Sequence, residues 1–156
     1  MIPRKQAQAF LNDEGNQWLS RNREKLRGSR SDPVLSAIEK SGIEFSNVLE
    51  IGCSNGFRLE ALRKKYGCHA FGVDPSSEAI NEGMKKYPKL ILAQKVAHEI
   101  PKVNNFFELV IYGFCLYLVD REDLFRVVYE GDRVLADGGH LAIYDFAPDH
   151  PHSVIY

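Results

Sequence analysis

The sequence predicts an α/β fold: a doubly wound parallel sheet of about five strands with helices on both faces. Short runs of apolar and β-branched residues alternate along the 156-residue chain with segments whose apolar residues recur at helical spacing. The runs are apolar at consecutive positions, as is typical of parallel strands covered on both faces. With 44% hydrophobic residues, the chain can bury one sizeable core.

The first predicted elements are helical. Residues 1–31 are polar, and their few apolar residues, such as Trp18, fit two short amphipathic helices. Asp32 is a good helix cap and Pro33 fits a first helical turn, so the next helix is expected to begin there and to end at Gly42.

Strands and helices then alternate to the end of the chain. The expected strands are 48–51, 69–73, 90–93, 107–112 and 140–146. The expected helices are 57–66, a segment from Ser76 or Ser77 to Tyr87, and 121–135, which Gly138 and Gly139 should end. We therefore divide the chain into a helical extension (1–31), an α/β domain (32–147) and a C-terminal tail or truncation point (148–156).

The charge of the chain is balanced. Its 20 Lys and Arg against 21 Asp and Glu give a net charge of −1, without the basic excess of a dedicated nucleic-acid binder. Residues 1–31 have a local basic surplus, which could contact a membrane or nucleic acid but is more typical of a solvated helix face. No run of about 18 apolar residues predicts a spanning helix.

Cysteine and histidine usage predicts no disulfide and no metal site. Cys53, Cys68 and Cys115 are odd in number and lack CxxC spacing, as expected for reduced thiols in the cytoplasm. His150 and His152 could bind a metal, but two histidines in a tail are more typical of an exposed segment.

The segment after the first predicted strand carries a candidate ligand site. Gly52 lets the chain turn sharply, and small residues up to Gly56 let a ligand approach the backbone, whose amides are expected to point at it. Asp74, 22 residues after Gly52, ends the second predicted strand, where an acid can accept hydrogen bonds from both hydroxyls of a ribose. This order of elements predicts a nucleoside site.

Two other interpretations of this loop are weaker. A dinucleotide site needs glycine where Ser54 and Phe57 stand, which disfavours a nicotinamide-dependent oxidoreductase. Ser54 also has the setting of a hydrolase nucleophile, but His140 lies at the wrong end of the fifth predicted strand.

Five motifs lie in register with these elements: VLEIGCSNG at 48–56, FGVDPS at 71–76, AHEIP at 97–101, FELVIYGFCLYLV at 107–119 and LADGGHLAIYDF at 135–146. Together they resemble the class I S-adenosylmethionine-dependent methyltransferases over roughly residues 31–147. The resemblance implies a Rossmann-like fold, S-adenosylmethionine as cofactor with S-adenosylhomocysteine as product, and in-line methyl transfer to a small-molecule acceptor such as a sugar or metabolite. The segment after the fourth strand is not of the Asn-Pro-Pro-Tyr type, which argues against a DNA acceptor.

The resemblance also implies roles for individual residues. The methionine and ribose part of the cofactor would be lined by Glu50, Gly52, Cys53, Ser54 and Gly56, and the ribose hydroxyls would be held by Asp74. Adenine would be packed by Pro75 and read near Ala97 and His98, while the sulfonium and the acceptor would be bordered by Tyr112, Gly113 and Phe114. Plain core roles are the alternative for Cys53, Tyr112 and Phe114. The resemblance extends to an N-terminal stretch of some members, here Trp18, Arg21 and Asn22. In those members an Arg or Asn can contact the methionine carboxylate of the cofactor.

The sequence departs from the family pattern in the adenine site. Val96 stands where many members carry an acid that bonds to the adenine amino group. Adenine would then be held by the backbone or by His98 or Glu99.

The second departure is in length. Five strands are expected where the family has seven, so the sheet would have an exposed apolar edge strand. Either the chain is truncated, or a partner such as a second copy covers this edge. A cofactor-binding subunit without activity is therefore the alternative function. The catalytic base is not assigned; its candidates are His98, Tyr112, Asp145 and His150.

Overall fold

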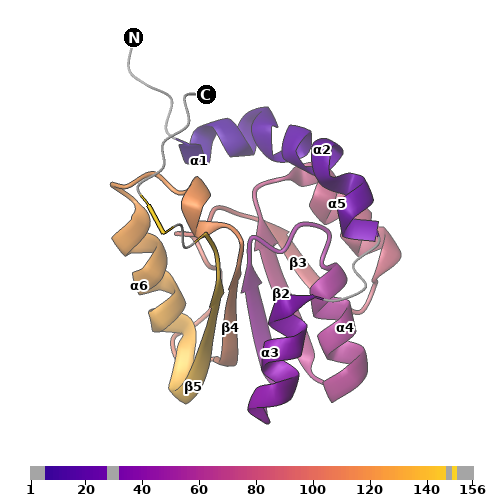
Figure 1. The fold of residues 1–156 in the computed structure, drawn as a ribbon, viewed down its shortest axis with the longest axis vertical. Coiled ribbons are helices and arrows are strands. Elements are labelled where there is room, and N and C mark those ends of the chain that lie inside the picture. Colours follow the sequence, from indigo (N-terminus) through magenta and orange to yellow (C-terminus); the bar gives the residue numbers. More distant parts are fainter. Residues whose placement is uncertain (1–5, 28–31, 147–148, 151–156) are drawn as a thin grey trace.

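A computed structural model describes residues 6–27, 32–146 and 149–150. Five parallel strands form one sheet in the order β3-β2-β1-β4-β5 (Figure 1). The strands are β1 (Asn47–Ile51), β2 (His69–Asp74), β3 (Ile91–Gln94), β4 (Phe107–Gly113) and β5 (Leu135–Tyr144). The predicted fold class is confirmed, and the third strand lies one residue later than expected.

Helices cover both faces of this sheet. The first face packs against α3 (Pro33–Ser41), α4 (Phe57–Tyr66) and α5 (Ser77–Lys86), and the second face packs against α6 (Leu124–Val134). Side chains alternate between the two faces along β1, so the core has one part on each face: Val48 points to the first face and Leu49 to the second. No helix among the described residues is long and apolar enough to cross a membrane.

The helix starts follow the predicted capping residues. The Asp32 carboxylate accepts hydrogen bonds from the Val34 and Leu35 amides, and Gly42 ends α3 in the left-handed conformation. The Ser76 hydroxyl accepts a hydrogen bond from the Ala79 amide and so begins α5.

The N-terminal segment is one continuous helical run, and the prediction of two short helices is wrong. It comprises α1 (Gln6–Ala9), a π-helical turn η1 (Phe10–Glu14) and α2 (Gly15–Arg27), and Ala9 and Gly15 keep right-handed helical backbone at both junctions. A π-turn adds a residue without ending the helix, so the apolar spacing shifts as it would across a break.

This segment lies across the carboxyl end of the sheet (Figure 1). The Gln6 amide donates to the Asp120 carboxylate at 2.6 Å, and the Ser76 hydroxyl lies 2.8 Å from the Asn16 amide oxygen. A side chain at Gly15 would meet the Ser76 amide at 3.1 Å, so glycine allows this close approach.

The expected boundary between the last helix and strand is also wrong. The helix ends at Val134 and β5 begins directly at Leu135, which pairs with Phe107. The next pair along the ladder joins Leu109 to His140, so residues 136–139 bulge out. Gly138, at φ +76°, shapes this bulge and does not end the helix.

Candidate functional site

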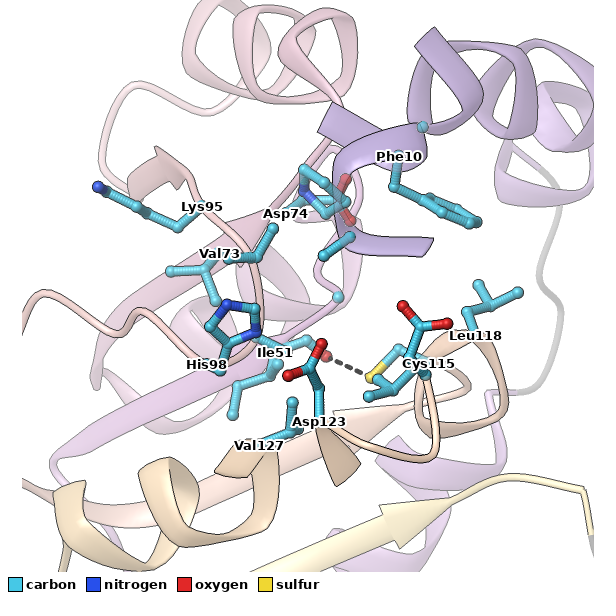
Figure 2. Close-up of a pocket in the computed structure, with 18 of the residues that line it drawn as sticks. Phe10, Ile51, Val73, Asp74, Lys95, His98, Cys115, Leu118, Asp123 and Val127 are labelled. Atoms are coloured by element: carbon cyan, nitrogen blue, oxygen red, sulfur yellow. Dashed lines mark hydrogen bonds between the residues drawn. The ribbon is translucent and has the colours of Figure 1, made fainter. Parts of the chain in front are cut away.

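A pocket lies at the carboxyl ends of β1, β2 and β4, beneath the N-terminal segment (Figure 2). The loops that follow these strands and β3 form most of its wall, and Phe10, Gly15 and Trp18 close it from the N-terminal side. This is the position expected for a ligand in a parallel sheet with helices on both faces.

The glycine loop after β1 turns back on itself. Gly52, Ser54 and Gly56 all have positive φ. The amides of Gly52 and Cys53 donate to the Val73 carbonyl, at 2.9 and 3.1 Å, and the Ser54 amide donates to Asp74. The expectation that these amides point at a ligand is therefore wrong, because β2 takes them. A loop with so few free amides suits a ligand without phosphate there.

Gly52 also lets two loops approach each other. A side chain at this position would meet the Cys115 Cβ at 2.7 Å, and the Cys115 thiol donates to the Ile51 carbonyl at 3.2 Å. The loop after β1 and the loop after β4 thus form one wall of the pocket.

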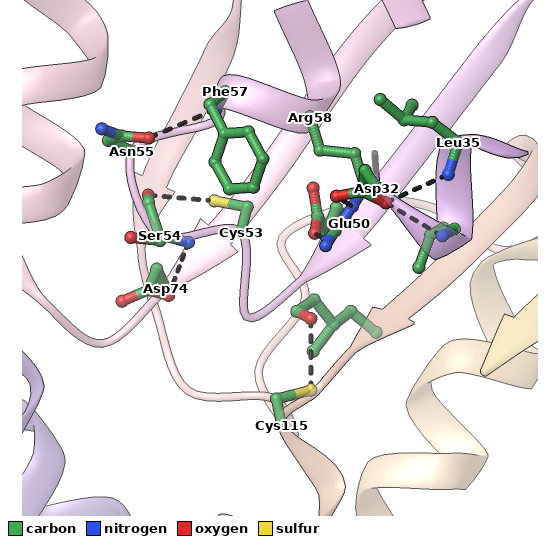
Figure 3. A network of polar contacts seen from close by, with 12 residues as sticks. Asp32, Leu35, Glu50, Cys53, Ser54, Asn55, Phe57, Arg58, Asp74 and Cys115 are labelled. Atoms are coloured by element: carbon green, nitrogen blue, oxygen red, sulfur yellow. Dashed lines mark hydrogen bonds and ion pairs between the residues drawn. The ribbon is translucent and has the colours of Figure 1, made fainter. Parts of the chain in front are cut away.

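Asp74 joins the glycine loop (Figure 3) to the start of α5. Its two carboxylate oxygens accept hydrogen bonds from the Ser54 and Ser76 amides, each at 2.8 Å. Burial raises the pKa of this carboxyl to about 6, against the lowering effect of the Ser76 and Ser54 amides. Asp74 also lines the pocket, where a carboxylate can accept hydrogen bonds from hydroxyl groups.

Below the pocket lies a buried ionic triad of Asp32, Glu50 and Arg58 (Figure 3). Arg58 donates to both carboxylates, yet one Glu50 oxygen, Oε2, is buried without a hydrogen-bond partner. Burial raises the pKa of Glu50 to about 7, although Arg58 acts to lower it. A side chain at Gly113 would meet Glu50 Oε1 at 2.7 Å, so Glu50 lies directly beneath a residue of the pocket wall.

The predicted site residues divide into two groups. The pocket is lined by Gly52, Asp74, Pro75, Ala97, His98, Gly113 and Phe114. Outside its lining lie Glu50, Cys53, Ser54, Gly56 and Tyr112, which support the wall from behind.

Tyr112 differs most from its predicted role. It is fully buried, and its hydroxyl donates to the Val127 carbonyl at 2.8 Å. Burial raises the pKa of this hydroxyl well above its usual value. The side chain fills the core between β4 and α6, where Gly131 makes room for it. Tyr112 is thus no candidate base.

The structure places the other three candidate bases in different surroundings. Asp145 accepts hydrogen bonds from the Leu116 amide at 2.7 Å and the Tyr117 amide at 3.3 Å, so it orders the loop after β4. His150 is exposed, and His152 lies outside the described residues. His98 lines the pocket.

The N-terminal stretch contributes one side chain to the pocket. Trp18 lines it, whereas Arg21 is exposed and paired with Glu14, and the Asn22 side chain donates to the Trp18 carbonyl at 2.9 Å. No group of three or more metal-ligating side chains occurs in residues 6–27, 32–146 and 149–150.

Sequence reasoning missed several residues that line the pocket, namely Phe10, Lys95, Cys115, Leu118, Asp120 and Asp123. Most lie in the N-terminal segment or in the loop after β4. Asp120 and Asp123 both precede α6, where an acidic residue has the sequence pattern of an ordinary helix cap, so the pattern gave no separate signal.

Comparison with known proteins agrees with this arrangement. Residues 48–139 match the model of a family described as a methyltransferase domain. An uncharacterized protein of Haemophilus influenzae is 29% identical over 104 residues, which cover 63% of this chain and 41% of the relative.

Two solved structures share the fold. A chain in a complex containing the Haloferax volcanii Trm112 methyltransferase activator has a TM-score of 0.73 at 21% identity, covering 85% of this chain and 59% of that one. The plantazolicin methyltransferase BpumL, solved with a desmethyl-plantazolicin analogue and S-adenosylhomocysteine, has a TM-score of 0.69 at 21% identity, covering 90% and 56%. The chain thus spans about half the length of the relatives it matches.

Proposed function

The chain belongs to the class I S-adenosylmethionine-dependent methyltransferases, and from that membership we propose that it methylates a small-molecule acceptor. The observation that carries the proposal is Asp74, a pocket carboxylate at the end of β2 held by two backbone amides. In this position it would accept the ribose hydroxyls of the cofactor.

The other residues of the pocket suit the same cofactor. The glycine loop offers little for a phosphate, which suits a nucleoside bound to an amino acid. Glu50, whose Oε1 lies beneath Gly113 and whose Oε2 has no hydrogen-bond partner among the described residues, would attract the positively charged methionine end. Pro75, Ala97 and His98 would border adenine.

The task of the chain would be alignment and exclusion of water. The cofactor, when bound, supplies a methyl group on a positively charged sulfur, which in-line attack by the acceptor displaces. Phe10 and Trp18 would shield that end of the pocket from water, and Gly113, which has no side chain, leaves room for Glu50 and Arg58 directly beneath the wall.

An aromatic cluster beside the pocket supports a small-molecule acceptor. Phe114 lines the pocket and packs against Tyr117, Tyr144 and Phe146, with ring centroids 5.1, 5.7 and 4.6 Å away. Phe114 has φ +64°, a strained conformation for a bulky residue and one that marks functional sites. Such rings offer stacking faces to a flat or sugar-like acceptor.

Titration with S-adenosylhomocysteine tests the proposal. We expect a micromolar dissociation constant, about −8 kcal/mol, and at least about tenfold weaker binding by Asp74→Asn and Asp74→Ala. Glu78→Ala, which removes a nearby exposed acid, should bind like the wild type. A folded wild-type chain that shows no binding would overturn the proposal. Methyl transfer by the chain alone would exclude the alternative of a silent partner subunit.

We also infer that a second copy of the chain covers β5. This strand is at the edge of the sheet, with Leu141, Ile143 and Tyr144 exposed. Phe125 and Tyr129 of the adjacent α6 are exposed as well. Two identical edge strands related by a twofold axis are self-complementary, so pairing would bury these side chains and bond the free backbone groups.

A cytoplasmic location is proposed from the cysteines. All three are free in the structure, which fits a compartment where disulfides are rare. Alkylation in denaturant immediately after extraction from the natural host should label every thiol, because Cys53 and Cys68 are buried in the folded protein, and a disulfide would contradict the proposal.

A further inference from the structure

Asp123 is a buried carboxylate whose side chain has no hydrogen-bond partner among the described residues. It is the residue before α6 and only 8% exposed, and its side chain makes no cap hydrogen bond to that helix. An Asp in this position normally accepts from the amides of the first helical turn, as Asp32 does for α3. Figure 2 shows the Asp123 side chain turned into the pocket.

The surroundings of Asp123 suit a flat ring with a hydrogen-bond donor. Ile51, Val73 and Val127 belong to one apolar cluster and line this part of the pocket, and His98 points into it as well (Figure 2). A ligand that fills this part of the pocket excludes water from the carboxylate, which is unfavourable unless the ligand donates a hydrogen bond to it. The ligand must therefore bring an N–H or O–H group to this place.

The proposed cofactor, on which this inference rests, offers few such groups. Asp74 would take the ribose hydroxyls, and Glu50, beneath the wall at Gly113, would attract the positively charged methionine end. The adenine amino group is left, and Val96 removes the acid that many family members place beside it. Glu99 does not replace that acid, because it is exposed and lies 3.9 Å from Lys95.

We propose that Asp123 accepts a hydrogen bond from the exocyclic amino group of adenine. The carboxylate comes from the residue before α6 instead of the loop after β3, so a different element of the pocket wall would read the amino group. This makes Asp123 a specificity-determining residue for the cofactor, selecting adenine over bases without that amino group.

Calorimetry with two ligands tests the role of Asp123. The first ligand is S-adenosylhomocysteine, and the second is its analogue with hydrogen in place of the adenine amino group. Wild type should prefer the first by about tenfold or more, as expected for one hydrogen bond to a charged group. Asp123→Ala should reduce this preference to within about twofold, and Asp123→Asn, which keeps one acceptor and the side-chain volume, should reduce it at least about threefold.

Asp132→Asn is the matched control. It removes one exposed charge from the same helix and should keep the full preference. Equal binding of the two ligands by wild type, or an unchanged preference in both Asp123 variants, would overturn the inference and leave the proposed function standing. If neither ligand binds to a wild-type chain that melts cooperatively, the proposed function itself fails.

Discussion

At the scale of single residues, Asp74 links proton binding to ligand binding. Its pKa is raised to about 6, and only the ionised carboxylate can accept both ribose hydroxyls. A ligand that requires this form expels the proton, so affinity is lost as the pH falls through 6 and is retained above it. We expect the dissociation constant of S-adenosylhomocysteine to rise about tenfold between pH 7 and pH 5.

Asp74→Asn isolates this effect by calorimetry across the same pH range. Its amide does not ionise, so its binding should be weaker and should lose less affinity than the wild type between pH 7 and pH 5. The Glu50 carboxyl, with a pKa raised to about 7, titrates in both proteins, so the effect of Asp74 is taken from the difference between the two pH profiles. An equally steep loss of affinity in the variant would show that Asp74 is not the responsible group.

The residue scale also shows what the sequence can predict of a site. The position of Asp74 followed from the order of loop, helix and strand, which fixes where β2 ends. The roles of the loop amides did not follow, because the Val73 carbonyl that accepts from Gly52 and Cys53 belongs to a different strand. Asp123 gave no signal, because a cap and a pocket carboxylate have the same sequence pattern.

At the scale of elements, the buried triad holds α3, α4 and β1 together. Arg58 of α4 pairs with Asp32, which caps α3, and with Glu50 of β1. Removing the shared cation leaves two buried carboxylates uncompensated. We expect Arg58→Ala to lower the free energy of unfolding by about 3–5 kcal/mol at pH 8 in urea titrations.

Arg63→Ala, on the same helix, is the control for this prediction. Its partner Glu60 is three residues away and the pair is partly solvated, so the loss should stay below about 1 kcal/mol. The loss from Arg58→Ala should shrink at pH 6, because Glu50, with a pKa of about 7 beside Arg58, is largely protonated there in both proteins. Equal effects of the two substitutions would contradict a stabilising role for the triad.

The differences between predicted and observed elements have local causes. The N-terminal run reads as two helices because the π-turn at Phe10–Glu14 shifts its apolar spacing. Gly138 and Gly139 have the sequence of a helix end, yet they form a bulge within β5. A pair of glycines marks unusual backbone in both cases, and only the pairing of β5 with β4 distinguishes them.

At the scale of the whole molecule, the alternation of strands and helices was enough to predict the parallel sheet. Covering both faces of the sheet constrains the inner strands β1, β2 and β4 to nearly continuous buried runs, which are a strong pattern in the sequence. The packing of the N-terminal segment over the pocket was not predictable, because it depends on single polar contacts such as that between Gln6 and Asp120. Such contacts have no periodicity.

The two edges of the sheet allow a matched test of self-association. Ile143 on β5 and Ile91 on β3 are both isoleucines on edge strands, 56% and 54% exposed. Exposed aromatic residues of α6 flank only the β5 edge, so we expect dimers to form there. In sedimentation velocity experiments over a range of concentrations, Ile143→Lys should weaken the dimer at least about tenfold, because pairing would bury its charge. Ile91→Lys should associate like the wild type. A wild-type chain that stays monomeric, or a dimer that only Ile91→Lys disrupts, would refute pairing through β5.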